Sequence, residues 1–115
     1  MNEQNVILEK SMEFAIRIVN LYKYLSNSKK ETVMSKQLLR SGTSVGANIR
    51  EAKYGQSKAD FISKMSVSLK EAAETGYWLE LLYRTEYLTE EEYESMRKNY
   101  EEIIKLLTSI VKNSK

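Results

Sequence analysis

The side chains with the strongest chemistry in this sequence are carboxylates, because the chain contains no histidine and no cysteine. Disulfides, zinc fingers, thiol nucleophiles and Ser-His-Asp triads are therefore excluded. Glu71 and Glu74 stand three residues apart, on one face of a helix, and Glu51 of a preceding helix could approach them. Buried together, such carboxylates would have raised pKa values and could bind a hard metal ion. Carboxylate metal sites in bundles usually include histidine, so we favour a structural role as hydrogen-bond acceptors and predict no catalytic residue, no metal and no cofactor.

A second group combines positive charge with an aromatic ring around the junction of the second and third predicted helices. Lysine and arginine contact phosphates, and a tyrosine ring stacks on an unpaired base. The alternative is that these are ordinary solvated side chains, whose apolar stems cover neighbouring surface. The formal net charge of +2 is too small to decide between the two. The candidate nucleic-acid-binding residues are Arg40, Arg50, Lys53, Tyr54, Lys58 and Lys64.

Aromatic side chains form a third group, with eight tyrosines and one tryptophan. Between residues 77 and 83, large apolar side chains spread around more of a helix than one small core can bury. An excess of this kind over wide stripes is typical of protein–protein interfaces. We therefore expect the chain to self-associate rather than to remain a monomer.

Long helices must position these groups. The chain of 115 residues has no proline and only four glycines, so it has few of the residues that end helices. Apolar residues recur at spacings of three and four over four segments, about 5–25, 31–54, 58–84 and 90–112. Because the connections are short, the sequence predicts a single all-α domain over 1–115, an antiparallel up-down-up-down four-helix bundle with neighbours about 20° apart.

Polar residues mark the expected helix ends. The run Ser26-Asn27-Ser28 competes with helical backbone bonding and is predicted to be the first turn. Gly55 suits a C-terminal cap. Two pairs at the spacing of a capping box indicate helix starts: Ser57 with Asp60, and Thr89 with Glu92.

The stretch 41–48 gives conflicting signals. Its glycines and serines favour a loop, and Gly42 and Gly46 each cost a helix about 1 kcal/mol relative to alanine. Helical spacing nevertheless continues through it, so the pattern alone leaves helix and loop nearly equal. In a helix, the two glycines would form a notch, and a small-residue stretch at 72–76 predicts a close crossing of the second and third helices there. Asn48 is expected to fix the register of such a contact.

No apolar run approaches the roughly 18 residues that a membrane span requires. The first five residues also lack the basic start of a signal peptide. We therefore expect a cytoplasmic protein without membrane partners.

Two stretches carry a family resemblance. The first reads Gln-Leu-Leu-Arg-Ser-Gly-Thr-Ser-Val-Gly-Ala-Asn-Ile-Arg-Glu-Ala at 37–52, and the second reads Ser-Leu-Lys-Glu-Ala-Ala-Glu-Thr-Gly-Tyr-Trp-Leu at 68–79. Over about residues 6–112 the chain resembles the four helix bundle protein family. This family is also called the 23S rRNA intervening-sequence protein family, because some members are encoded in insertions within bacterial large-subunit ribosomal RNA genes.

The resemblance implies a left-handed antiparallel four-helix bundle in which 41–48 is helical. It also implies a ring-shaped homo-oligomer, with a pentamer as the expected form. A related protein, the accessory variability determinant of diversity-generating retroelements, works with a reverse transcriptase and its RNA through a strongly basic surface, whereas the charge here is milder. No catalytic residues come with the family. The matched positions expected to be structural are Ser44, Asn48, Glu51, Glu71 and Glu74.

Together these observations favour a non-enzymatic homo-oligomeric bundle that acts as an RNA- or DNA-associated scaffold, with a reverse transcriptase or another protein as a further partner. The alternative hypothesis is a protein-interaction module that binds no nucleic acid.

Overall fold

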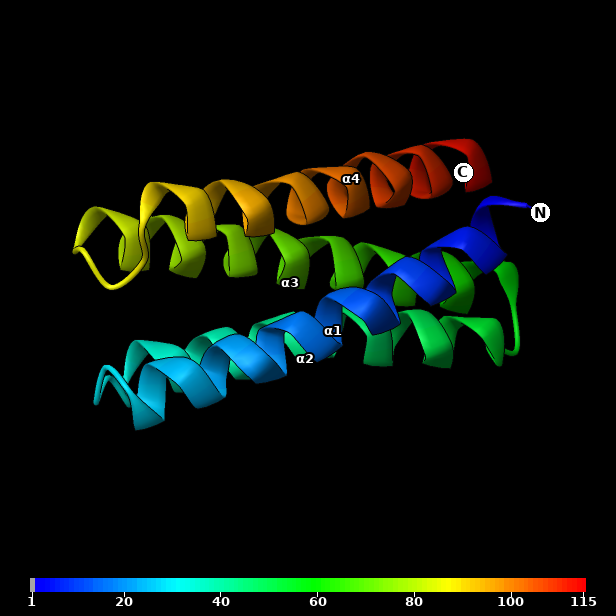
Figure 1. Ribbon diagram of the computed structural model, residues 1–115. Coiled ribbons are helices and arrows are strands. Elements are labelled where there is room, and N and C mark those ends of the chain that lie inside the picture. The colour runs from blue at the N-terminus through cyan, green and yellow to red at the C-terminus, as the bar shows by residue number, and fades with distance from the viewer. Residues whose placement is uncertain (1) are drawn as a thin grey trace.

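The computed structural model describes residues 2–115, which form four helices: α1 (Glu3–Asn27), α2 (Met34–Lys53), α3 (Lys58–Arg84) and α4 (Glu90–Ser114). Successive helices run in opposite directions, so the two chain ends lie at the same end of the bundle as the α2–α3 connection (Figure 1). The molecule is elongated, with extents of 44 × 21 × 20 Å. The predicted all-α, up-down-up-down bundle is confirmed.

The helices occupy the corners of a square in chain order. Each helix packs along the next, and α4 packs back against α1, whereas the backbones of the diagonal pairs, α1 with α3 and α2 with α4, do not approach each other closely. The core along the square's axis is apolar, and its fully buried side chains include Ile7, Phe14, Ile18, Leu38, Ile49, Met65, Leu79 and Leu107. Burial of these residues is what holds the amphipathic helices together.

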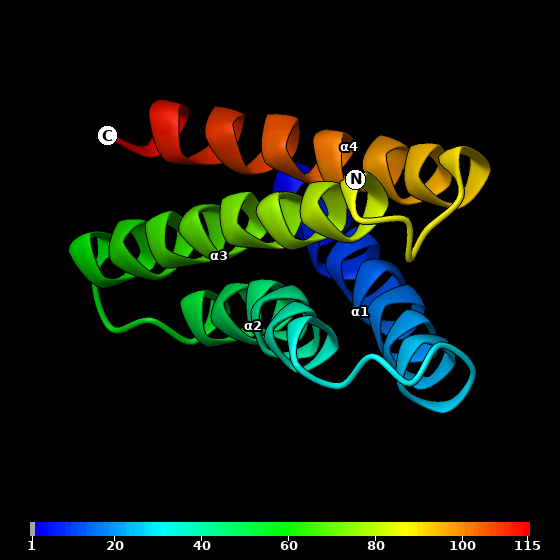
Figure 2. The same ribbon diagram turned by 90° about the vertical axis from the view of Figure 1, so that its left-hand side faces the viewer.

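The α1–α4 contact is the least extensive of the four, and the two helices diverge away from the chain ends (Figures 1 and 2). Hydrogen bonds and an ion pair join α1 to α4. Arg17 donates to the Ser95 carbonyl (3.3 Å) and hydroxyl (2.7 Å) and to the Asn99 side chain. Lys10 pairs with Glu102 at 2.6 Å, which raises the pKa of Lys10, and Ser109 donates to Glu3 at 2.8 Å.

The first turn lies later than the sequence predicts. Residues 26 and 27 belong to α1, where the Ser26 hydroxyl donates to the Tyr22 carbonyl (2.8 Å) and so remains compatible with a helix. The second helix starts at Met34 instead of 31. The reason is Glu31, whose buried carboxylate accepts from the amides of Val33, Met34 and Ser35 at 3.2, 3.1 and 2.7 Å and thereby caps the helix from outside.

The N-terminal caps of α3 and α4 are the residues predicted from the sequence, Ser57 and Thr89. Thr89 and Glu92 form the full reciprocal capping box. At the start of α3, the Ser57 hydroxyl accepts from the Asp60 amide at 3.0 Å, but the Asp60 carboxylate accepts from Gln56 rather than from Ser57. That pair is therefore half of a capping box.

The stretch 41–48 is helical within α2, but the glycine notch faces a different neighbour from the one expected. A Cβ on Gly42 would lie 2.8 Å from two side-chain carbons of Ile18, and a Cβ on Gly46 would lie 3.4 Å from the Ser11 hydroxyl, so the notch accommodates α1. Gly76 likewise faces Tyr100 of α4. The predicted close contact between α2 and α3 is present, but these glycines do not form it. A glycine pattern shows that a helix approaches without showing which one.

Hydroxyl side chains occupy the close α2–α3 contact instead. The Ser68 hydroxyl donates to the Val45 carbonyl at 2.8 Å, and the hydroxyls of Thr75 and Ser41 lie 2.9 Å apart. All three hydroxyl residues are buried. None of the helices within 2–115 is long and apolar enough to cross a bilayer.

Candidate nucleic-acid interface

The α2–α3 connection gathers the candidate basic residues at one end of the bundle. α2 ends at Lys53, Tyr54 caps it, and α3 begins at Lys58. Gly55 has no left-handed backbone here. A Cβ on it would lie 3.1 Å from both the Ala52 carbonyl and the Asp60 carboxylate, so it is needed for space rather than for the positive φ of the predicted cap.

Four of the six candidates lie within this connection or the helix turns beside it: Arg50, Lys53, Tyr54 and Lys58, which we call the basic corner. All four are exposed, and the Tyr54 ring is 73% accessible. The Lys53 ammonium lies 5.7 Å from the centre of that ring. Within residues 2–115, none of the three cations forms an ion pair. The corner therefore offers unneutralised charge beside a largely exposed aromatic ring.

The other two candidates, Lys64 and Arg40, form ion pairs with glutamates. The Lys64 ammonium lies 3.2 Å from a Glu51 carboxylate oxygen, which offsets its charge. Arg40 lies ten residues before Arg50 on the same helix, about 15 Å along its axis, so it does not border the junction as the sequence analysis expected.

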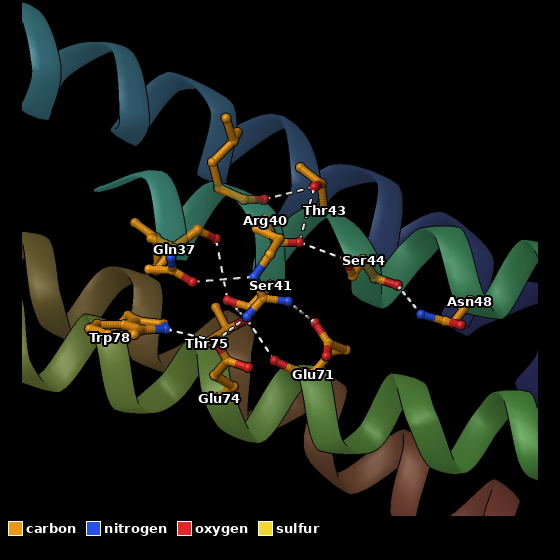
Figure 3. Close-up of polar contacts among 12 residues, drawn as sticks. Gln37, Arg40, Ser41, Thr43, Ser44, Asn48, Glu71, Glu74, Thr75 and Trp78 are labelled. Atoms are coloured by element: carbon orange, nitrogen blue, oxygen red, sulfur yellow. Dashed lines mark hydrogen bonds and ion pairs between the residues drawn. The ribbon is translucent and has the colours of Figure 1, made fainter. Parts of the chain in front are cut away.

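Arg40 instead bridges α2 to α3 (Figure 3). Its guanidinium donates to Glu71 at 3.1 Å and also to Glu74, which in addition accepts from the Trp78 indole at 2.9 Å. These bonds lower the pKa of the Glu74 carboxyl, chiefly through Arg40, and raise the pKa of Arg40. The arrangement joins two helices and leaves Arg40 with little charge to offer a phosphate.

The three candidate carboxylates do not meet. Glu71 and Glu74 bind Arg40, whereas Glu51 pairs with Lys64 farther along α2. Among residues 2–115, no group of three acidic side chains is arranged to hold a metal ion.

Ser44 and Asn48 make hydrogen bonds within α2 only (Figure 3). The Ser44 hydroxyl donates to the Arg40 carbonyl at 2.6 Å, and the Asn48 amide donates to the Ser44 carbonyl at 2.9 Å. The bonds that span α2 and α3 come from Ser68 and Thr75, which were not predicted to join the two helices. Ser68 and Thr75 are seven residues apart and therefore lie on the same face of α3. This spacing is the feature of the sequence that could have indicated their contact with α2.

This fold defines a small four-helix bundle protein, and the basic corner lies exposed at one end of the bundle. The model of the family described as 23S rRNA-intervening sequence protein matches residues 3–109. The chain belongs to this family.

A solved structure supports the same conclusion. The crystal structure of a protein with unknown function from the S23 ribosomal protein family of Bacteroides thetaiotaomicron VPI-5482 is 65% identical, with a TM-score of 0.95. The match covers 96% of this chain and 99% of that one. No curated protein matches this chain. The comparisons that match indicate no class of enzyme.

Proposed function

We propose that this chain is a non-enzymatic, homo-oligomeric scaffold of the cytoplasm that associates with RNA through its basic corner. The observation that carries the proposal is the basic corner, in which the Lys53 ammonium lies 5.7 Å from the centre of the Tyr54 ring, and that ring is 73% exposed. Arg50 and Lys58 are exposed close by in the sequence, and like Lys53 they form no ion pair within residues 2–115. Phosphates bind the cations, and an unpaired base stacks on the ring. Membership of a family named for ribosomal RNA insertions supports RNA as the ligand.

Oligomerisation strengthens such weak contacts. A single corner carries three cations, which gives modest affinity at physiological salt. Several copies in one assembly present several corners to the same strand, and linked contacts raise the overall affinity. An enzyme that processes RNA, including a reverse transcriptase, is a fitting partner for a scaffold of this kind.

Filter binding of a single-stranded RNA at two salt concentrations tests the proposal. Three phosphate contacts predict a slope of about −2 in log K against log salt, so affinity falls roughly tenfold or more between 50 and 200 mM salt. Replacing Arg50, Lys53 and Lys58 by alanine should remove that dependence, and Tyr54→Ala should cost about 1–3 kcal/mol of stacking.

The matched control removes the same charge elsewhere. Lys36, Lys98 and Lys105 are exposed and form no ion pair in the described part of the chain. Their triple alanine variant should bind RNA as the wild type does. Equal losses in both triple variants would show that the corner is not a site.

A protein-interaction module without RNA binding is the second candidate function, and exposed apolar side chains on α1 and α3 favour it. Pull-down from lysate with and without nuclease separates the two. A partner that remains after nuclease treatment, together with RNA binding that lacks salt dependence, would favour this second function.

A further inference from the structure

A hollow of about 320 Å³ lies between α1 and α2, next to the basic corner. Binding sites for small organic groups have volumes of about 300–1,000 Å³, so the hollow is large enough to take a group of the size of a nucleobase. Its lining is mostly apolar but contains one cation. The lining residues that matter here are Leu8, Met12, Ala15, Gly46, Ala47 and Arg50.

The hollow stays open because the side chains around it are short. Gly46 of α2 faces Ser11 of α1, and a Cβ on Gly46 would lie 3.4 Å from the Ser11 hydroxyl, so the two helices are close at this point. Ala15 and Ala47 line the hollow and are too short to fill it. Met12, which is 44% exposed, forms part of its wall. The result is an apolar surface, open to solvent, against which a planar group can pack.

Two cations of the basic corner lie on the same side of α2 as the hollow. Gly46, Arg50 and Lys53 are separated by four and three residues, which is the spacing of one helix face, and the contact of Gly46 shows that this face is turned towards α1. Arg50 lines the hollow itself, and Lys53 lines a smaller hollow of about 60 Å³. Leu8 of α1 borders both, so the two hollows are neighbours. A strand whose phosphates bind these cations therefore has the larger hollow within reach of its bases.

The charge around the two hollows suits a polyanion. Neither has a carboxylate in its lining. By contrast, the hollow between α1 and α4 has Glu91 and Glu92 beside its arginine, and the hollow at the α3–α4 connection has Glu86 beside its cations. Those surfaces carry mixed charge, whereas the charged groups of the two hollows beside the corner are cations alone. Phosphates are attracted to the latter.

Tyr54 offers a second surface for a base close to the hollows. The Lys53 ammonium lies 5.7 Å from the centre of the Tyr54 ring, and the same side chain lines the smaller hollow. Lys53 therefore connects the exposed ring to the hollows. Neighbouring nucleotides of one strand can place one base on the ring and another in the larger hollow.

We propose that the hollow between α1 and α2 is a base-binding site, in which an unpaired base of the bound RNA packs while Arg50 and Lys53 bind the adjoining phosphates. The inference rests on the proposed RNA association and specifies the surface that takes the base. Proteins that bind single-stranded RNA pack its splayed-out bases against side chains in this way. Packing against an apolar surface is tolerant of base identity, so the site favours unpaired RNA without selecting a sequence.

Filling the hollow without changing its charge provides the test. Ala47→Leu places a larger apolar side chain there from α2, and Ala15→Leu does so from α1. Alanine and leucine are both strong helix formers, so the fold should remain, and circular dichroism verifies this. In filter binding of a single-stranded RNA, each change should weaken affinity roughly tenfold, the loss of one base contact. The slope of log K against log salt should stay at about −2, because the three cations of the corner are unchanged.

Two controls separate base binding from charge and from added apolar surface. Inorganic polyphosphate carries charge without bases, so Ala47→Leu should bind it as tightly as the wild type does. Thr108→Leu adds a leucine at an exposed position of α4, outside the hollow, and should bind RNA as the wild type does. If Ala47→Leu binds RNA as tightly as the wild type, or loses RNA and polyphosphate equally, the inference is wrong.

Light scattering of the same variants tests for an indirect effect through assembly. Ala47→Leu and Ala15→Leu should have the mass of the wild-type protein. A changed mass together with weaker RNA binding would overturn the inference, because the hollow would then serve a contact between copies.

The triple alanine variant of Arg50, Lys53 and Lys58 separates this failure from failure of the proposed function. Wild-type protein that shows no salt-dependent RNA binding would overturn both. If the triple variant loses salt-dependent binding while Ala47→Leu and Ala15→Leu retain full affinity, the corner binds RNA through its charge and the base-binding site alone is refuted.

Discussion

Replacing Gly42 by alanine should destabilise the bundle, although alanine is the better helix former. Gly42 is buried in α2 directly against Ile18 of α1. A Cβ there would lie 2.8 Å from each of two Ile18 carbons and 3.1 Å from a third. Ile18 is 0% exposed and branched at Cβ, so its side chain has no free space into which to turn. The two helices must therefore separate or Ile18 must leave its preferred rotamer.

The expected change in stability is the difference between two opposing effects of the added methyl group. Overpacking a well-packed core costs about 1–3 kcal/mol. Replacing glycine by alanine inside a helix stabilises the helix by about 0.5–1 kcal/mol. The contacts are shorter than real Cβ contacts, so the overpacking term dominates, and we expect a net loss of about 1–2 kcal/mol. For a chain of 115 residues this lowers Tm by roughly 4–8 °C.

Gly46, one turn later, is the matched control. The nearest atom to its missing Cβ is the Ser11 hydroxyl at 3.4 Å, an ordinary contact. Gly46→Ala should therefore stabilise the protein by about 0.5–1 kcal/mol through helix propensity alone. Urea unfolding followed by circular dichroism, at one protomer concentration for all variants, measures both changes.

The Ile18→Ala background tests the cause. This change alone costs about 2–5 kcal/mol because it leaves a cavity. It also removes all three carbons that crowd position 42. In that background, Gly42→Ala should no longer destabilise, so the double-mutant cycle should show coupling. If Gly42→Ala is as stable as the wild type, or if its cost is the same with and without Ile18→Ala, steric conflict with Ile18 is not what the glycine avoids.

Three further changes test the polar contacts. Arg40→Ala should reduce stability by up to about 1 kcal/mol, since the pairs are partly exposed. Arg40 lowers the pKa of Glu74 below the ordinary value of 4.5 for a glutamate carboxyl. The stabilisation is therefore present above that pH and is lost as pH falls through the folded-state pKa, so the stabilities of variant and wild type should converge in urea titrations at acid pH. Thr75→Val should cost about 1–2 kcal/mol in thermal unfolding, because it removes the buried bond to Ser41 at constant shape. Glu31→Ala should speed hydrogen exchange of the amides at 33–35, whereas an unchanged rate would show that another group caps α2.

Local pattern predicted the helices well, because amphipathic spacing and caps depend on residues close in sequence. Thr89 and Glu92 are three residues apart, and their capping box followed from that spacing. The glutamate at position 31 was not predicted as a cap, because its three bonds depend on how the turn folds back over α2. The stretch 41–48 is helical because α1 packs into it, and tertiary packing overrode the low propensity of glycine.

The candidate site was predicted only in part, since charge type is visible in sequence but ion pairing is not. Arg50, Lys53 and Lys58 have no ion-pair partner in the described part of the chain, whereas Arg40 binds two glutamates from 31 and 34 residues away. Separations of this size depend on which helix faces which, and no spacing rule within one helix encodes them. The same limit explains why the glycine notch was assigned to the wrong neighbour.

The contact between α1 and α4 determines how the bundle responds to force. Both chain ends lie at one end of the molecule, and Glu3 near the first residue is bonded to Ser109 near the last. A pull between the termini therefore acts across the helix axes and loads this contact first. Its bonds, from Glu3 to Arg17, lie in sequence along α1, so they break one after another instead of sharing the load. The bundle should unzip at low force when pulled by its ends, and resist far more strongly when pulled along its length.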